Sequence, residues 1–344
     1  MIVLSTIHFF NDTIACVLGI VLNLLLMYVI IKTLNRNIRS YGYLVFVGAA
    51  FDVLFAIVEL ITLHQLLIKD GIMFIMSWGV EYSLYSYVGH FFMFWHCTVG
   101  MHGLWLLAAQ YNFRYEIITN SAVSIRLLVR NVAITFSLSL LMAIFGYYGT
   151  IQAINRRGRE YYAKQINANW LDREGSLHFI YAMDFRDSAT LIFFFVSFLI
   201  TIVCYCVSMF YAWKAYKFIR EHRSADRSQR TVRLESQFTK SSKSVRVETT
   251  VNAIIFAAAP IILMCVSMQL RLDIWFAGLW TMSFLSFLPA ANAILALCVI
   301  KTYRNCLIST FHLKWLIVQL RGKLNESTTF RTTTNRVSAV SNVI

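Results

Sequence analysis

The sequence predicts an all-α membrane protein that folds as a bundle of seven transmembrane helices. Three observations lead to this fold class. Seven long apolar stretches fill most of the 344 residues, hydrophobic residues make up 58% of the chain, and charged residues make up only 14%. A soluble domain carries about 25% charged residues, whereas about 20 apolar residues in an α-helix cross the roughly 30 Å hydrocarbon core of a bilayer. The expected spans are residues 10–31, 42–67, 85–111, 128–150, 188–213, 250–270 and 276–300.

The positive charges predict how these spans are oriented. Of the 31 lysines and arginines, 23 fall in segments that are cytoplasmic if the N-terminus lies outside the cell, and eight fall on the opposite side. Basic residues favour the cytoplasmic side, so we expect an extracellular N-terminus in a multi-pass protein of the plasma membrane. The net charge of +14 is therefore a topology signal and attracts anionic lipid; no nucleic-acid partner is expected. The first apolar run is too long for a signal peptide and is expected to remain as an anchor.

The hydrophilic segments divide the chain into a seven-span domain over residues 1–310 and a cytoplasmic tail over 311–344. Segment 221–248 is polar, basic and serine-rich, which indicates a cytoplasmic loop between the fifth and sixth spans. Segment 302–320 is expected to form a short amphipathic helix along the inner membrane surface. The Ser/Thr-rich end of the chain that follows is expected to be disordered.

Two sites of covalent modification are candidates. Asn11 begins the sequon Asn-Asp-Thr on the expected outer side, where it could be glycosylated. Cys306 lies just beyond the seventh span and could be palmitoylated. None of the seven cysteines falls in the outer loop 151–187, so no extracellular disulfide framework is expected.

Polar residues inside the spans are costly and therefore informative. At about 1.5 Å of rise per residue, Asn23, Asp52 and Asn292 lie at a similar depth, roughly 13–18 Å from the cytoplasmic boundary. A buried carboxylate needs such polar partners, or it takes up a proton. Two interpretations stay open. The three residues either hold helices together or form a polar core that rearranges when the protein changes state.

The only two prolines, Pro260 and Pro289, lie inside the sixth and seventh spans. Proline in a helix interior removes a backbone hydrogen bond and kinks the helix, which a membrane bundle tolerates. The two kinks are either hinges for a switching motion or fixed bends that only shape the bundle.

Several ordered motifs resemble one known family. Span 1 carries GIVLNLLLMYVIIKT, the entry to span 2 carries RSYGYLVFVGAAFDVLF, span 3 ends in LLAAQYNFRYEI, and span 7 ends in FLPAANAILALCVIKTYRNCL. Together these motifs resemble the nematode serpentine chemoreceptors of the Str superfamily, with the Srd and Str branches nearest. The resemblance covers about residues 15–310. It implies a G protein-coupled receptor of rhodopsin-like architecture, in the cilia of sensory neurons, that detects an odorant or pheromone.

The resemblance also implies roles for residues at the inner ends of the helices. Arg114 and Tyr115 take the place of the receptor arginine motif that meets the heterotrimeric G protein, and Tyr303 and Arg304 match the inner end of the seventh helix. A receptor kinase or an arrestin could bind the Ser/Thr-rich tail. The chain departs from the pattern at Ala293, where a proline is common, and lacks the outer-loop cysteine that usually bridges to helix 3.

A ligand would lie in the outer halves of the spans, in an apolar cavity with a few polar groups. On span 3, four candidates follow a helical stripe, although each candidate taken alone could simply pack the bundle. Three histidines of that span, six residues apart, share no helix face and make a poor metal site, so neither a metal nor a cofactor is expected. The pocket candidates are Glu59, His64, Gln65, Tyr87, His90, Phe94, Cys97, Met264, Ser267, Met268, Trp280 and Ser283.

Other classes of function are opposed by specific features. A retinal photoreceptor needs a lysine in its seventh helix, and residues 276–300 contain none. An inverted seven-helix chemosensory channel is the main alternative, and the distribution of positive charge opposes it. A transporter usually shows repeated halves, which are not found, and no motif of a hydrolase or metalloenzyme is present, so an enzyme is not expected.

Overall fold

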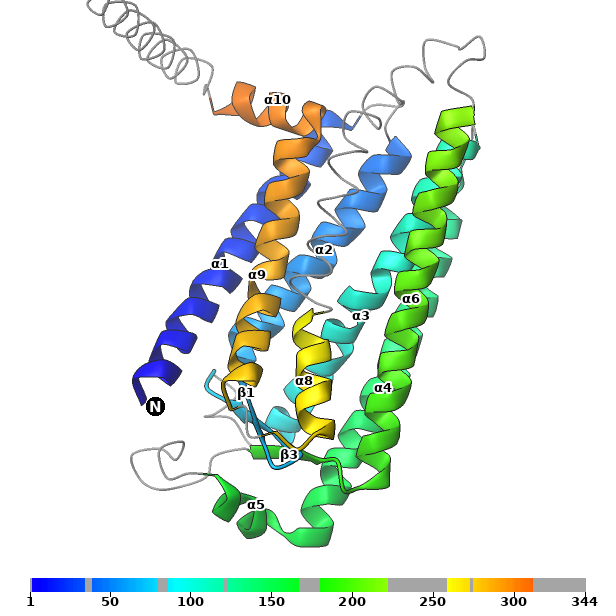
Figure 1. Ribbon diagram of the computed structural model, residues 1–344. Coiled ribbons are helices and arrows are strands. Elements are labelled where there is room, and N and C mark those ends of the chain that lie inside the picture. Colours follow the sequence, from blue (N-terminus) through cyan, green and yellow to red (C-terminus); the bar gives the residue numbers. More distant parts are fainter. Residues whose placement is uncertain are drawn as a thin grey trace, which may run out of the picture.

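The protein is a mostly helical bundle in the computed structural model (Figure 1), which describes residues 2–34, 39–79, 86–120, 123–166, 180–221, 259–272 and 275–311. The long helices are α1 (Ile2–Thr33), α2 (Arg39–Thr62), α3 (Ser86–Thr119), α4 (Ile125–Arg157), α6 (Ser188–Glu221) and α9 (Trp275–Val299), joined by the shorter α8 (Ala259–Gln269). Two small helices, α5 (Arg159–Gln165) and α10 (Lys301–Thr310), lie at opposite ends of the bundle.

Six of the described helices are long and apolar enough to cross a membrane. Only the end of the expected span 250–270 is described, as the 11 residues of α8. The outward faces of the long helices carry exposed apolar side chains, among them Phe195 and Met209 of α6, which are 63% and 66% exposed. Such a surface suits lipid rather than water, and the predicted all-α membrane fold is confirmed.

The helices pack in two connected groups. Helix α1 lies against α2 and α9, while α3 lies against α4 and α6, and α2 joins the two groups through its contact with α3. Gly19 lets α1 approach α9 closely, because a Cβ atom there would lie 3.1 Å from Cβ of Pro289. Pro289 lies inside α9 as expected. Pro260 is the second residue of α8, and the residues before it are outside the described part of the chain.

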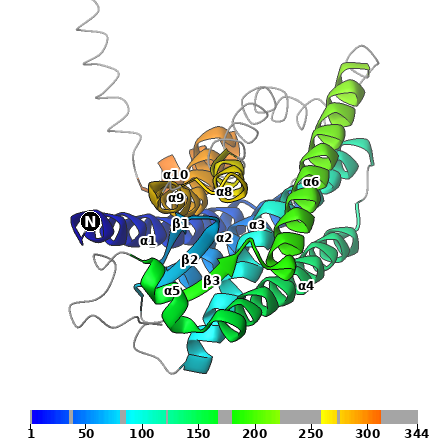
Figure 2. The ribbon, with the colours of Figure 1, turned by 60° about the horizontal axis from the view of Figure 1, so that its bottom comes forward.

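A three-stranded antiparallel sheet, absent from the sequence-based prediction, covers the end of the bundle where the chain begins (Figures 1 and 2). Its strands are β1 (His64–Lys69), β2 (Ile72–Ser77) and β3 (Ile180–Asp184). The expected second span, 42–67, was therefore wrong at its end: α2 stops at Thr62, and Leu63 takes a positive φ of 42°.

The hairpin between β1 and β2 turns on Asp70 and Gly71, which have φ angles of 50° and 74°. Two positive φ angles in a two-residue loop are the geometry that Asp-Gly favours, and they match the twist of the flanking strands. Lys69 then pairs with Ile72, and Ile72 in turn pairs with Asp184 of β3. The turn thus sets the register of the whole sheet.

Both faces of the sheet are buried, which explains why its strands are mostly apolar. Residues such as Leu66, Met73 and Met183 pack into the main core of the bundle, whereas Leu67 and Phe74 pack on the opposite face against α5. The sheet is therefore an internal layer between the helices and α5.

The far end of the bundle is closed by α10. The expected amphipathic segment 302–320 forms this helix as far as Thr310, and the residues after Phe311 are outside the described part. Tyr303 is 1% exposed and packs in a cluster with Leu26 and Ile30 of α1. Lys32 of α1 donates a hydrogen bond of 3.1 Å to Thr310, so α10 is anchored to α1.

Candidate functional site

One cavity of about 370 Å³ runs along the inside of the bundle. At one end it is bounded by the sheet, through Leu66, Met73 and Ile75, and at the other end by Tyr41 and Arg114. Most of the lining is aliphatic, aromatic or sulfur-containing. A mostly apolar cavity of this size with a few polar groups fits a small organic molecule.

Four polar side chains meet at the sheet end of this cavity. Nδ1 of His96 lies 3.1 Å from Nδ1 of His64, 3.2 Å from Oγ1 of Thr62 and 3.2 Å from Oε2 of Glu59. We call these four residues the His96 cluster. Glu59, Thr62 and His64 are almost fully buried, and both histidines line the cavity. Burial lowers the pKa of His64 to about 3, so His64 is neutral at physiological pH.

A second polar group lies in the middle of the cavity. The Asn292 amide donates a hydrogen bond of 3.2 Å to Asp52, which brings α9 onto α2. Asn23 is fully buried, and its amide donates at 2.9 Å to the carbonyl oxygens of Gly19 and Pro289. All three expected polar residues line the same cavity, although no hydrogen bond joins Asn23 to the other two within the described residues.

At the end opposite the sheet, Arg114 lines the cavity, and its guanidinium carbon lies 5.1 Å from the ring centre of Tyr111. Its Nε is buried and has no hydrogen-bond partner among the described residues. Tyr115 instead faces α6, where its ring lies 5.7 Å from that of Tyr211 and from Nζ of Lys214. Arg304 is exposed and donates to the carbonyl oxygen of Cys298 at 3.1 Å.

Tyr303 does not fit the role that the resemblance implies. With 1% of its surface exposed, it cannot touch a partner protein in this conformation, because α1 and α10 cover it. We therefore treat Tyr303 as a packing residue.

Some of the expected pocket residues line the cavity, and others do not. His64 and Cys97 line the cavity. His90 and Phe94 pack beside Tyr147 of α4 instead, with ring centres 5.6 and 6.4 Å from it. Trp280 is 62% exposed and lies on the outside of the bundle, so its assignment to the pocket was wrong.

The remaining pocket candidates lie behind or beside the cavity wall. Glu59 reaches the cavity only through His96, while the Ser283 hydroxyl donates at 3.2 Å to Asp12 of α1. Gln65, Ser267 and Met268 are fully buried and are not among the described lining residues. Tyr87 and Met264 lie in α3 and α8, and their side chains are outside the description.

The two modification candidates have structured surroundings. The sequon that begins at Asn11 lies within α1, where the Thr13 hydroxyl donates at 2.7 Å to the carbonyl of Phe9. This helical setting differs from the surface loop in which an occupied sequon is expected. Cys306 is half-buried in α10, with Sγ 3.9 Å from Oγ1 of Thr310.

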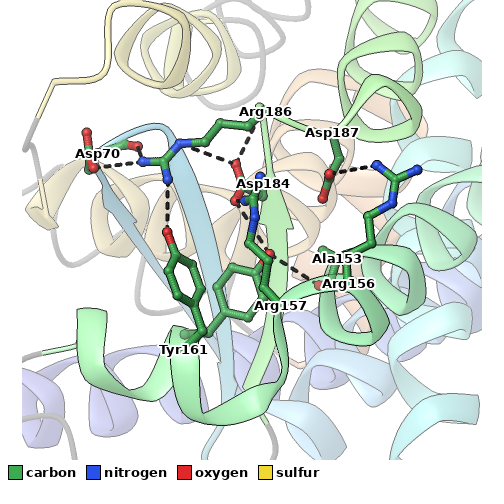
Figure 3. A network of polar contacts seen from close by, with 9 residues as sticks. Asp70, Ala153, Arg156, Arg157, Tyr161, Asp184, Arg186 and Asp187 are labelled. Atoms are coloured by element: carbon green, nitrogen blue, oxygen red, sulfur yellow. Dashed lines mark hydrogen bonds and ion pairs between the residues drawn. The ribbon is translucent and has the colours of Figure 1, made fainter.

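An ion-pair network fastens the sheet to the ends of α4 and α5 (Figure 3). Asp184 at the end of β3 is fully buried and pairs with Arg157, while Arg156 pairs with Asp187 at 3.1 Å. Arg186 spans the sheet edge: it donates at 2.8 Å to Asp70 in the hairpin turn and at 2.9 Å to Tyr161 of α5.

Tyr162 of α5 completes this network. Its hydroxyl donates to Asp184 and to the carbonyl oxygen of Ala153, each at 3.4 Å, and burial raises the pKa of this phenol above its usual value. The phenol therefore stays protonated and able to donate. The network ties the sheet, which bounds the cavity, to α4 and α5.

Comparison with known proteins identifies the group of proteins to which this architecture belongs. The family described as "Serpentine type 7TM GPCR chemoreceptor Str" matches residues 8–308, which is most of the chain. The chain belongs to this family. It is thus a multi-pass membrane protein of a GPCR-like chemoreceptor family, and its relatives are receptors rather than enzymes.

Two Caenorhabditis elegans proteins illustrate the relationship. The chain is 28% identical over 162 residues to serpentine receptor class delta-1, an alignment that spans 46% of this chain and 43% of the relative. It is 27% identical over 128 residues to serpentine receptor class delta-2, spanning 36% and 34% of the two chains. The chain thus matches less than half the length of either relative. The expected resemblance to the Srd branch of the Str superfamily is confirmed.

Proposed function

We propose that this protein is a chemosensory receptor that binds a small environmental chemical, an odorant or a pheromone, and activates a heterotrimeric G protein. The observation that supports this most directly is the extent of the cavity, which has His64 and the sheet at one end and Arg114 at the other. A ligand at the sheet end would share one continuous space with the residues that face a G protein.

The proposed mechanism is a shift between two populated conformations. A ligand can move such an equilibrium only by binding one conformation more tightly than the other. The polar residues Asp52 and Asn292 lie between the two ends of the cavity and bridge α2 and α9. We propose that this pair rearranges while the helix that includes α8 moves outward, with Pro260 and Pro289 as the hinges. The inner face would then open around Arg114, Tyr115 and Arg304.

The proposal includes an orientation and a location. The N-terminus and the sheet would face the outside, because 23 of the 31 basic residues then lie on the cytoplasmic side. The receptor would lie in the plasma membrane, in the cilium of a sensory neuron. Anionic lipid would bind its basic inner face, and a receptor kinase or an arrestin would act on the Ser/Thr-rich tail.

Two experiments test the proposal. Epitope tags at the two termini, detected in intact and in permeabilised cells, should place the N-terminus outside and the C-terminus inside. The reverse arrangement would instead support an inverted ligand-gated channel. In cells that carry a calcium or cyclic-nucleotide reporter, panels of volatile and water-soluble compounds should yield a response that disappears when loop 214–248 is replaced. A response that survives this replacement would count against G protein coupling.

A further inference from the structure

The His96 cluster fixes the position of one proton. The Thr62 hydroxyl donates its hydrogen to the carbonyl oxygen of Val58 at 3.0 Å, so only a lone pair of its oxygen remains for His96. An imidazole nitrogen that faces such a lone pair carries hydrogen, which assigns the N–H of His96 to Nδ1. His64 then turns its unprotonated Nδ1 toward this group, 3.1 Å away.

The other ring nitrogen of His96 has a different environment. Nε2 makes no hydrogen bond within the described residues, since every polar contact of this side chain goes through Nδ1. The side chain is 13% exposed and lines the cavity. Because Nδ1 carries the hydrogen of a neutral imidazole, Nε2 offers a lone pair. The cavity therefore contains a hydrogen-bond acceptor beside apolar neighbours that include Phe55, Met93 and Cys97.

Glu59 lies next to this imidazole. It is 0% exposed, and its Oε2 lies 3.2 Å from Nδ1 of His96. The lone pair of Nε2 is therefore offered in a mostly apolar space, where a charged ligand would be costly to bury.

We propose that the ligand of this cavity is a small, uncharged, mainly apolar molecule with a hydroxyl group that donates its hydrogen to Nε2 of His96. This inference rests on the proposed function of the cavity as the ligand site. A ketone or an ether of the same carbon skeleton would place its own lone pairs against that nitrogen and leave two acceptors unpaired. Such a mismatch weakens binding by roughly ten- to hundred-fold.

The test measures binding directly to the full-length receptor in lipid nanodiscs, with 2-octanol, 2-octanone and 2-methoxyoctane as matched probes. We expect 2-octanol to bind at least about ten-fold more tightly than 2-octanone or 2-methoxyoctane. His96→Phe should abolish this preference. His102→Phe is the matched control, because His102 is a buried histidine of the same helix that packs between Phe51 and Phe136 and is not among the described lining residues. It should keep the preference.

Because His96→Phe removes the imidazole that lies 3.2 Å from Glu59, the double variant Glu59→Gln/His96→Phe provides a second test in which no buried carboxyl group loses this neighbour. The inference is overturned if the wild-type protein binds no 2-octanol, binds the three probes equally, or prefers 2-octanone, and also if either His96 variant keeps the preference. A preference for 2-octanol in a protein that activates no G protein would leave this inference standing and would reject the proposed function.

Discussion

The amide of Asn292 in α9 donates to the carboxylate of Asp52 in α2, with 3.2 Å between Nδ2 and Oδ2. Both residues line the cavity, so this hydrogen bond joins the two helices at the cavity wall. Asn23 adds a second polar tie, from α1 to the carbonyl of Pro289 one turn earlier in α9. Helix α9 is therefore held on both sides at the level of its proline.

We predict that Asp52→Asn changes the sensitivity of the receptor to an agonist found by the reporter screen. An amide in place of the carboxylate weakens the bridge to Asn292 and alters the balance of the two conformations. Couplings of this kind change affinity by about five-fold or more. The measurement is a dose–response curve at matched surface expression. The exchanged variant Asp52→Asn/Asn292→Asp restores an amide–carboxylate pair and should recover much of the wild-type response. If the dose–response curve of Asp52→Asn is the same as that of the wild type, Asp52 and Asn292 only pack the helices together.

The outer network gives a prediction about stability. Asp184 is 0% exposed and pairs with Arg157, so Arg157→Met leaves a buried carboxylate without its closest cation, with Nε of Arg186 3.9 Å away. Breaking such a pair costs about 3–5 kcal/mol. We expect a marked fall in the thermal denaturation temperature of the purified protein.

The pair between Arg186 and Asp70 provides the matched comparison for this variant. Asp70 is 56% exposed on its side chain, and exposed pairs contribute about 0–1 kcal/mol. Asp70→Asn should therefore lower the denaturation temperature only slightly. Equal losses in the two variants would show that burial does not govern the strength of this network.

Burial of His64 makes stability depend on pH. Its pKa of about 3 in the folded protein lies below the ordinary value of about 6.5, so the unfolded chain binds more protons between these two values. The free energy of unfolding is therefore highest above pH 6.5. Below that pH it falls by about 1.4 kcal/mol per pH unit, because the unfolded chain takes up a proton that folded His64 does not. Between pH 6.5 and pH 5 the loss should be about 2 kcal/mol. His64→Phe keeps a ring beside His96 and removes the titrating group, so denaturation temperatures measured from pH 7.5 to pH 5 should fall less steeply in this variant. Parallel curves would contradict the prediction.

The helices could be predicted from the sequence because each is a long apolar stretch, and hydrophobicity decides whether a stretch crosses lipid. Their ends could not, since helices continue into water beyond the bilayer: α3 runs on to Thr119 and α6 to Glu221. The sheet was missed because Leu63, Leu66 and Leu67 continue the apolar run of the helix before them, and both faces of the strands are buried, which removes the alternation of a half-exposed strand. The dipeptide Asp70-Gly71 between two apolar runs was the local signal that could have revealed the hairpin.

The candidate site was predictable only in part, for a related reason. Depth along a helix follows from residue spacing, which predicted a similar depth for Asp52 and Asn292, and the structure joins the two by a hydrogen bond. Rotation of a helix about its axis depends on its neighbours, and sequence spacing alone left it open. Of the predicted stripe, His90 and Phe94 therefore contact Tyr147 of α4, whereas Cys97 lines the cavity together with His96, which was not among the candidates.

The last prediction concerns Arg114 near the C-terminal end of α3. Its side chain lines the cavity, and its Nε has no hydrogen-bond partner among the described residues, so little folding energy depends on its polar contacts. We expect Arg114→Ala to abolish signalling while the protein still reaches the cell surface, because the cation that would meet the G protein is lost. Arg130→Ala is the control, since Arg130 is an exposed cation near the start of α4 on the same side, and it should signal normally. The measurements are reporter output and surface labelling of a tagged receptor. A normal response from Arg114→Ala would remove this arginine from the proposed interface, whereas loss of surface labelling would assign it a structural role.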